Sequence, residues 1–397
     1  MGFLNSLFGP PDIEKLKTKT DIAGLVKAAG HKDYETRRKS REALIEFKEA
    51  AGDHLLKMLR EKEERRTVAA SLIKEIAFVP KTGLDRLFLM LADEDWEGLV
   101  NLGRQAVPDL LQLFRTSTPD NSSALAAAWS LGIFTPEEAL EPLAVCLEEG
   151  GPSIDSLAAL TLAGYGRTGA ERLCRSLNDP KVAPGKKIYA THALARIGPE
   201  AVPALKAVLA TRTDEIAAYC AITLGACGDP GIVETVRNKK SEISNAEIQE
   251  AFELVVSAWA NPPDSLIDEV DSYNSGMRIM AALSLGHLRE TRAAQPLQSA
   301  LEDANPDAFS AKARAISKIG DRDAIDALAR HVAVSDPPKQ MLAILAMSER
   351  ADPSIADRLI PYQKSPSLMV RMATGLSLVS LRFRTAAAGG ISRNQNQ

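Results

Sequence analysis

The five histidines are the residues of this chain best suited to metal binding or acid–base chemistry. Two of them have a carboxylate at helical spacing: Glu35 lies four residues after His31, and Glu290 lies three residues after His287. A metal site on helices needs a second pair of ligands that converges on the first. The chain contains no His-Glu dipeptide. We therefore predict no metal site and expect both pairs to lie at the surface.

Residues 164–169, Gly-Tyr-Gly-Arg-Thr-Gly, match the pattern G-x-G-x-x-G of dinucleotide-binding proteins. That motif follows a strand and opens a helix toward the pyrophosphate, whereas an Ala-rich helical segment, residues 157–163, precedes the match here. We interpret it as a structural turn. The sequence contains no Walker A loop and no G-x-S-x-G elbow. No catalytic residue and no cofactor is predicted.

The four cysteines form no C-x-x-C pair and lie among apolar neighbours, which predicts buried free thiols. In an oxidising compartment they would allow three disulfide connectivities, and the sequence does not choose among them. They are Cys146, Cys174, Cys220 and Cys227.

The first six residues, Met-Gly-Phe-Leu-Asn-Ser, fit the pattern for N-myristoylation. Apolar side chains at Phe3, Leu4, Leu7 and Phe8 also form a short hook. Since the end of a repeat array needs a cover, we favour a hook that caps the first repeat, and docking on a partner is the other possibility.

The composition is that of a protein with an aliphatic core: 45% of the 397 residues are hydrophobic and only 5% are aromatic. No run of about 18 apolar residues and no signal peptide is present, so we expect a cytoplasmic protein without stable membrane insertion. The net charge of −4 is uneven: +4 over residues 1–90, −11 over residues 91–381 and +3 from residue 382 onward. The acidic body disfavours nucleic acid as a partner.

A short helix with a large aliphatic residue recurs about every 31 residues, except for one step of 23. This period fits two antiparallel helices of about 12 residues with two tight turns. The second helix is rich in Ala and ends at a Gly-containing turn, as at Gly198 and Gly320. The aliphatic positions are Leu25, Leu56, Leu87, Leu110, Leu143, Leu173, Leu205, Val236, Ile267, Leu297, Leu328 and Leu359.

These segments, among them residues 21–47, 196–205 and 318–328, resemble HEAT repeats of the short phycobilin (PBS) lyase type. The resemblance implies an all-α fold of the armadillo type, a right-handed α-solenoid of about twelve helical hairpins, and it does not specify an activity. The short step after Leu87 separates two subarrays. We predict an N-terminal hook and linker (1–20), a basic subarray (21–103), an acidic main array (104–381) and a flexible tail (382–397).

Second helices line the concave surface of such arrays, and their equivalent positions are largely apolar here. This predicts either an apolar groove that binds a partner or a thicker core between hairpins. Both alternatives stay open, because an error of one residue in the alignment of the second helices would turn a groove position into a core position. The groove positions are Trp129, Leu160, His192, Ile222 and Leu283, with Tyr189, Tyr219 and Met280 among those three residues earlier.

The sequence therefore favours a non-catalytic scaffold that binds a segment of a partner protein on its concave face. The alternative is a protein that handles a small chromophore, as the resemblance to bilin lyases implies, which would make it an enzyme of lyase-like activity. A nucleic-acid role is a third, disfavoured class.

Overall fold

The computed structural model describes residues 10–61, 66–116, 122–350 and 352–394, and within these ranges every regular element is a helix. The chain forms two compact units, residues 1–99 and 100–397. The division lies between Leu99 and Val100, inside the short helix α7 (Trp96–Asn101), whereas the sequence predicts it after residue 103. It coincides with the shortened repeat that follows Leu87.

The first unit is built from helical hairpins in which α2 packs on α3 and α4 packs on α5. On α3, Arg38 forms ion pairs with Glu35 and Glu42 along the exposed face, at 2.8 and 2.5 Å. This pattern is that of a solvated helix, as the alternating charges indicate. The helices are α1 (Ile13–Thr18), α2 (Ile22–Ala28), α3 (Tyr34–Glu46), α4 (Lys48–Glu61), α5 (Arg66–Glu75) and α6 (Gly83–Ala92).

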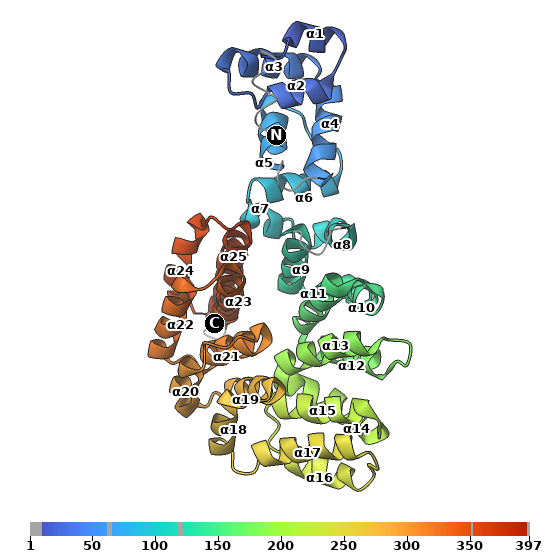
Figure 1. Cartoon of the computed structure of the whole chain (residues 1–397), viewed down its shortest axis with the longest axis vertical. Coiled ribbons are helices and arrows are strands. Elements are labelled where there is room, and N and C mark those ends of the chain that lie inside the picture. Colours follow the sequence, from blue (N-terminus) through green and yellow to red (C-terminus); the bar gives the residue numbers. More distant parts are fainter. Residues whose placement is uncertain (1–9, 62–65, 117–121, 351, 395–397) are drawn as a thin grey trace. The chain divides into compact units, whose positions relative to one another are not determined.

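The second unit stacks hairpins into an outer and an inner layer of helices (Figure 1). The outer helices are α8 (Val107–Thr116), α10 (Leu140–Glu149), α12 (Gly166–Asn178), α14 (Val202–Thr211), α16 (Ile232–Lys240), α18 (Asp264–Asp268), α20 (Ala294–Ser299), α22 (Arg322–Val334) and α24 (Ser354–Leu359). The inner helices are α9 (Ser122–Phe134), α11 (Pro152–Ala163), α13 (Pro184–Ile197), α15 (Glu215–Ala226), α17 (Ala246–Ala258), α19 (Ser275–Leu288), α21 (Pro306–Ile319), α23 (Pro337–Ser348) and α25 (Leu368–Asn394).

The array of this unit bends back on itself. In Figure 1 the green and yellow helices lie along one side of the unit and the orange and red helices return along the other. The bend is sharpest at α17, because α19 packs on α15 as well as on α17. At the far end, α25 packs against α9. The inner helices therefore face one another across the unit.

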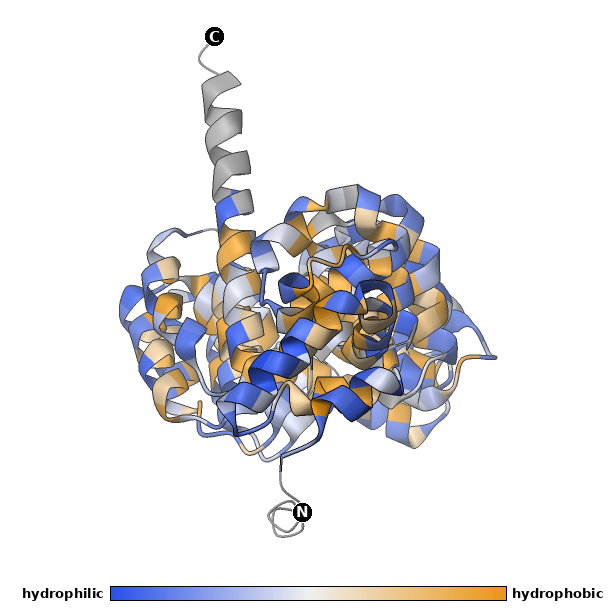
Figure 2. Cartoon of the chain, turned by 90° about the horizontal axis from the view of Figure 1, so that it is seen from above, coloured by the Kyte–Doolittle hydropathy of each residue, from blue (hydrophilic) through white to orange (hydrophobic). Residues whose placement is uncertain are grey.

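The aliphatic positions of the 31-residue period form the core, as predicted. Figure 2 shows both hydrophobic and hydrophilic stretches on the ribbons of many helices. Leu205, Leu297 and Leu328 are fully buried, and Leu56 is 7% exposed. The exception is Ile267, which is half-buried, whereas its neighbour Leu266 is fully buried. The period was therefore assigned one residue too late in the Pro-rich hairpin that follows Asn261.

Three helices, α3, α19 and α25, begin with the same arginine contact. Arg37, Arg278 and Arg371 each donate from Nη1 to the backbone carbonyls six and five residues before them, in the turn that precedes the helix. A guanidinium at this place satisfies carbonyl groups that have no partner in either helix. The recurring arginine thus ties the start of its helix to the turn that precedes it.

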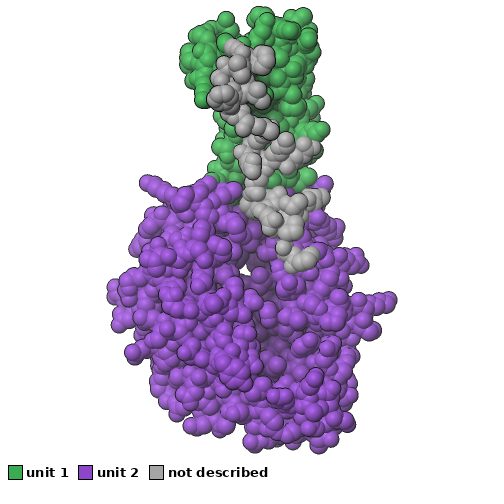
Figure 3. Space-filling model, viewed as in Figure 1, with its two compact units in different colours: residues 1–99 green, residues 100–397 purple. Residues whose placement is uncertain are grey.

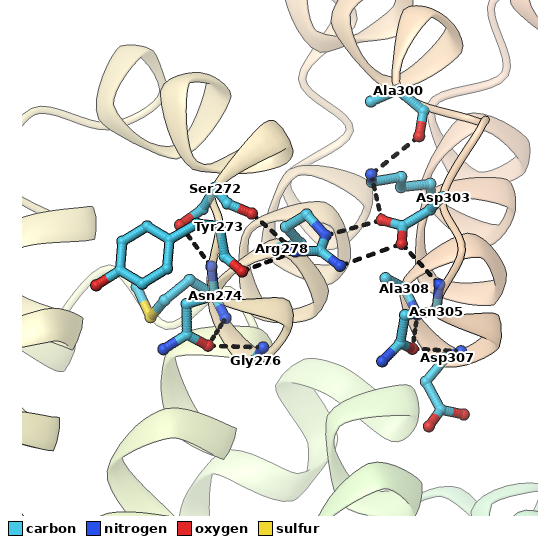
Figure 4. A network of polar contacts seen from close by, with 12 residues as sticks. Ser272, Tyr273, Asn274, Gly276, Arg278, Ala300, Asp303, Asn305, Asp307 and Ala308 are labelled. Atoms are coloured by element: carbon cyan, nitrogen blue, oxygen red, sulfur yellow. Dashed lines mark hydrogen bonds and ion pairs between the residues drawn. The ribbon is translucent and has the colours of Figure 1, made fainter.

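At α19 this arginine belongs to a buried network (Figure 4). Nε and Nη2 of Arg278 donate to Asp303, at 2.8 and 3.1 Å. Lys312 donates to the same carboxylate at 2.8 Å and to the carbonyl of Ala300 at 2.9 Å, and its side chain is only 1% exposed. Asp303 therefore ties α19 to α21 across adjacent repeats.

Two terminal assignments need correction. The predicted linker before residue 21 contains helix α1, whose Ile13 is buried. The predicted tail from residue 382 is helical as far as Asn394, because α25 continues through it. The N-terminal hook, residues 3–8, lies outside the described residues.

Candidate functional site

The inner helices of residues 100–397 enclose a cavity of about 830 Å³. Helices α9, α11 and α13 line one side of it, and α19, α21 and α23 line the other. Figure 3 shows that the face of this unit turned to the viewer is hollowed into a furrow. A cavity of this volume is within the range of ligand-binding sites in proteins.

Five of the eight side chains predicted for the concave face line this cavity. They come from four helices, and they differ in exposure: Leu160 is 41% exposed, Leu283 only 7%, Trp129 and Tyr189 are half-buried, and His192 is exposed. They lie on α9, α11, α13 and α19.

The other three predicted residues are not part of the cavity lining. Tyr219 and Ile222 are half-buried on α15, and Met280 is 1% exposed. A Cβ atom at Gly225 would lie 2.7 Å from Sδ of Met280, so this methionine fills the contact between α15 and α19. The physical reason is the bend of the array: α19 covers the face of α15 that would otherwise line a groove.

A cluster of charged side chains, which sequence reasoning missed, forms one part of the lining. Arg196, Arg314 and Glu349 come from α13, α21 and the end of α23. Oε1 of Glu349 forms an ion pair with Nη2 of Arg196 at 2.8 Å and accepts a hydrogen bond from Nη1 of Arg314. Arg384 of α25 donates to the carbonyls of Ser348 and Glu349, at 3.2 and 3.0 Å. The only signal in the sequence that could have indicated this cluster is a charged residue within an Ala-rich helix, such as Arg314.

Behind these arginines, Lys318 and His287 form a second polar contact. Nζ of Lys318 lies 3.0 Å from Nδ1 of His287, and Nε2 of His287 lies 2.9 Å from the carbonyl oxygen of Ala195. Since the carbonyl can only accept, Nε2 carries the proton and Nδ1 accepts from Lys318. His287 is therefore neutral and joins α13, α19 and α21, which corrects the expectation that it lies at the surface.

The surroundings shift both groups toward their neutral forms. Burial lowers the pKa of His287 to about 4, and the charge of Lys318 acts in the same direction. Burial also lowers the pKa of Lys318 to about 8; Glu349 opposes this shift, whereas Arg314 and Arg196 reinforce it. The ring of His287 also explains a glycine: Gly198 has φ +79°, and a Cβ there would lie 2.1 Å from Cε1 of His287.

We expect the second unit to lose about 3 kcal/mol of stability between pH 6.5 and pH 4 through His287 alone. In this window the unfolded chain binds a proton at the imidazole, whose ordinary pKa is 6.5, and the folded chain does not until about pH 4. The free energy of unfolding therefore falls as the pH falls. Urea unfolding at several pH values measures this slope.

His287→Phe should flatten the dependence on pH even though it lowers stability at pH 7, because the protonation step is removed. His192→Gln is the matched control, since His192 is exposed. An unchanged slope in His287→Phe would contradict the assignment.

Within the described residues, no three His, Cys, Asp or Glu side chains come together as a metal site. Glu290, expected to share a helix face with His287, instead accepts from the backbone N–H of Arg292 at 3.0 Å. The four cysteines are free and buried, as predicted. The same part of the chain holds no helix with the length and apolar character that a membrane span requires.

The family model for HEAT repeats matches residues 263–339, and the model for the PBS lyase HEAT-like repeat matches residues 124–149. No curated protein matches the sequence. The second of these matches covers most of α9, which carries Trp129, and all of α10.

Several solved structures are similar in fold. Human deoxyhypusine hydroxylase in complex with glycerol is 17% identical, with a TM-score of 0.38 over 70% of this chain and 96% of that chain. An engineered protein is also 17% identical, with a TM-score of 0.29 over 91% and 99% of the two chains. Kap121p bound to Nup53p is 12% identical, with a TM-score of 0.33 over 96% of this chain and 52% of that chain.

Proposed function

We propose that this HEAT-repeat protein, whose array includes a repeat of the PBS lyase type, is a non-catalytic scaffold that binds a short segment of a partner protein in the cavity of residues 100–397. The observation that supports this proposal most strongly is that Trp129, Leu160 and His192, from equivalent positions of successive inner helices, line one cavity together with Tyr189. Apolar and aromatic side chains around a concave space are the usual components of a binding site.

The volume limits the bound segment. A helix about 10 Å in diameter fills roughly 420 Å³ per turn of 5.4 Å, so about 830 Å³ corresponds to two turns. Because α25 packs against α9, the inner surface is not a long open groove. The proposal is therefore a short segment or a chain end that inserts between the two sides of the array, and not a long helix that lies along it.

Trp129→Ala and Tyr189→Ala are expected to weaken capture of the partner about 10- to 100-fold, because aromatic side chains in a concave site carry much of the binding free energy. Both side chains are only half-buried, so we expect each variant to lose about 1 kcal/mol of stability or less. A photo-crosslinking residue at position 160 captures the partner from host extract, and the two variants are then compared by pull-down of the identified protein.

Two controls separate binding from folding. Leu205→Ala removes a fully buried side chain and should cost about 2–5 kcal/mol. Tyr273→Ala removes a side chain that is 95% exposed and does not line the cavity, so it should change neither property. If Trp129→Ala and Tyr189→Ala destabilise the protein as much as Leu205→Ala and leave capture unchanged, the cavity lining is core and the proposed site is wrong.

The second candidate function is the handling of a bilin chromophore, which rests on the PBS lyase HEAT-like repeat at residues 124–149. Tyr189 and Trp129 could stack on a planar tetrapyrrole in the same cavity. Incubation with a free bilin would then produce a stoichiometric change in visible absorbance. Absence of that change, together with capture of a protein partner, favours the scaffold.

A further inference from the structure

Cations outnumber acids in the charged cluster of the cavity. Arg196, Arg314, Lys318 and Arg384 surround one carboxylate, that of Glu349. Glu349 pairs with only two of them within 4 Å, and across the described ranges neither Lys318 nor Arg384 has an acid at that distance. Arg384 is exposed, whereas Arg314 is buried and Arg196 and Lys318 are half-buried. Placing charges away from water without counter-charges is costly, so the excess among these three cations is unfavourable unless a ligand pairs with it.

The arginines also keep hydrogen-bond donors that no described residue uses. Arg196 contacts an acid only through Nη2, which pairs with Glu349. Arg314 uses Nη1 for Glu349 and Nε for a long contact of 3.4 Å to Ser310, which leaves Nη2. Arg384 uses only Nη1, for two backbone carbonyls. A guanidinium has five N–H groups in a planar fork suited to a carboxylate or a phosphate.

The rest of the lining is predominantly apolar. Leu125, Ile133 and Leu157 face the space from one side, and Ile279, Leu342 and Leu345 face it from the other. Two further acids, Glu200 and Asp307, line the cavity, but both are exposed and neither pairs with the cluster within the described chain. The cavity therefore has one cationic region and an apolar remainder.

We propose that Arg196, Arg314 and Arg384, with the charge of Lys318 behind them, form a binding site for the carboxylate of a ligand whose body is apolar and fills the remainder of the cavity. Oε1 of Glu349 lies between the guanidinium groups of Arg196 and Arg314 and holds both in place. The carboxylate of the ligand accepts hydrogen bonds from the N–H groups of these two arginines that remain free. A single carboxylate next to a hydrocarbon matches this surface better than a phosphate ester, whose second charge and stronger hydration oppose entry into an apolar space.

This inference deepens the proposed function and rests on it for the identity of the ligand: the carboxylate would be an acidic side chain or the chain end of the bound segment. The binding chemistry itself can be tested without the partner. Octanoate supplies one carboxylate on a flexible apolar body, so a chain that does not bind octanoate would overturn the inference. Capture of the partner by Trp129 and Tyr189 is a separate result and tests the proposed function.

The experiment is calorimetric titration of the full chain with octanoate, octanol, octylammonium and octyl phosphate. We expect saturable binding of one octanoate per chain, and binding at least about 10-fold weaker for octanol and octylammonium, because charge-assisted hydrogen bonds to a carboxylate are lost. Tighter binding of octyl phosphate than of octanoate would overturn the choice of carboxylate. Equal binding of all four would show that the cations play no part.

Two substitutions give independent readouts. Arg314→Met should weaken octanoate about 10- to 100-fold, with circular dichroism as the check on folding. Lys318→Met should weaken octanoate and at the same time raise the melting temperature of the ligand-free protein, because it removes a charge that the folded state keeps away from water. Arg167→Met is the matched control, since the Arg167 side chain is 73% exposed.

A lowered melting temperature of Lys318→Met with unchanged octanoate affinity would overturn the proposal, since it would mean that Lys318 only supports the fold. An unchanged affinity of Arg314→Met for octanoate would also overturn the proposal, since it would mean that the guanidinium of Arg314 does not bind the carboxylate.

Discussion

Glu349→Ala is expected to destabilise residues 100–397 by about 3–5 kcal/mol, the range for removal of one partner from a buried ion pair. The carboxylate of Glu349 pairs with Arg196 and Arg314, whose side chains are 21% and 9% exposed. Its loss leaves Arg196, Arg314 and Lys318, which are buried or half-buried, without a nearby counter-charge. Charges of these cations hold the pKa of Glu349 below its usual range even though burial alone would raise it, so the effect should be present throughout neutral pH.

The midpoint of the urea transition of the second unit measures this loss. Glu149→Ala is the control, because Glu149 is exposed on the same repeat array. Combining Glu349→Ala with Arg314→Met should recover part of the lost stability, because the second substitution removes the guanidinium of Arg314 that Glu349→Ala leaves unpaired. Additive effects in the double variant, or a loss below 1 kcal/mol in the single one, would show that the cluster is open to water.

Asp303→Ala should lower the free energy of unfolding of the second unit by a similar amount, about 3–5 kcal/mol, because it breaks the link between α19 and α21. It leaves Lys312 and Arg278 without their shared acceptor, and the side chains of these two cations are 1% and 15% exposed. Burial raises the pKa of Asp303, but hydrogen bonds from Arg278 and Lys312 outweigh this and hold it well below its usual range. Because the folded pKa is lowered, the stabilisation is full above the ordinary pKa of 3.8 and is lost only as the pH falls below it.

Asp307→Ala is the control for this prediction, since Asp307 is exposed in the first turn of the same helix, α21. We expect the two variants to differ by at least about 2 kcal/mol at pH 7, measured by urea unfolding. Hydrogen exchange should locate the loss at the contact of α19 with α21. Equal stability of the two variants would contradict the assignment of Asp303 as the link between these repeats.

The sequence was sufficient for the repeats because their determinants are local. The 31-residue period, the buried aliphatic positions and the prolines at the start of α8 and α14 all act within one hairpin or between neighbours. Even the error at Ile267 is local, since the buried side chain there is the adjacent Leu266. The positions on α9, α11 and α13 were also predictable, because these helices follow one another with the same spacing.

Met280 and Tyr219 mark where this reasoning ends. Their positions are equivalent in sequence to Tyr189, yet α19 packs on α15 and removes that part of the face from the cavity. Packing of α19 on α15 depends on the bend at α17, and small rotations between successive hairpins add up along an array. A sequence pattern within single repeats contains no information about the total of these rotations.

The sequence by itself determined that this chain is an array of helical hairpins, and which side of each helix is apolar. Only the tertiary structure brought Arg196, His287, Arg314, Glu349 and Arg384 together, from five helical segments spread over nearly half of the chain. The reason is physical: an aliphatic period specifies contacts between neighbours, whereas these charges meet because the curved array returns on itself until α25 reaches α9.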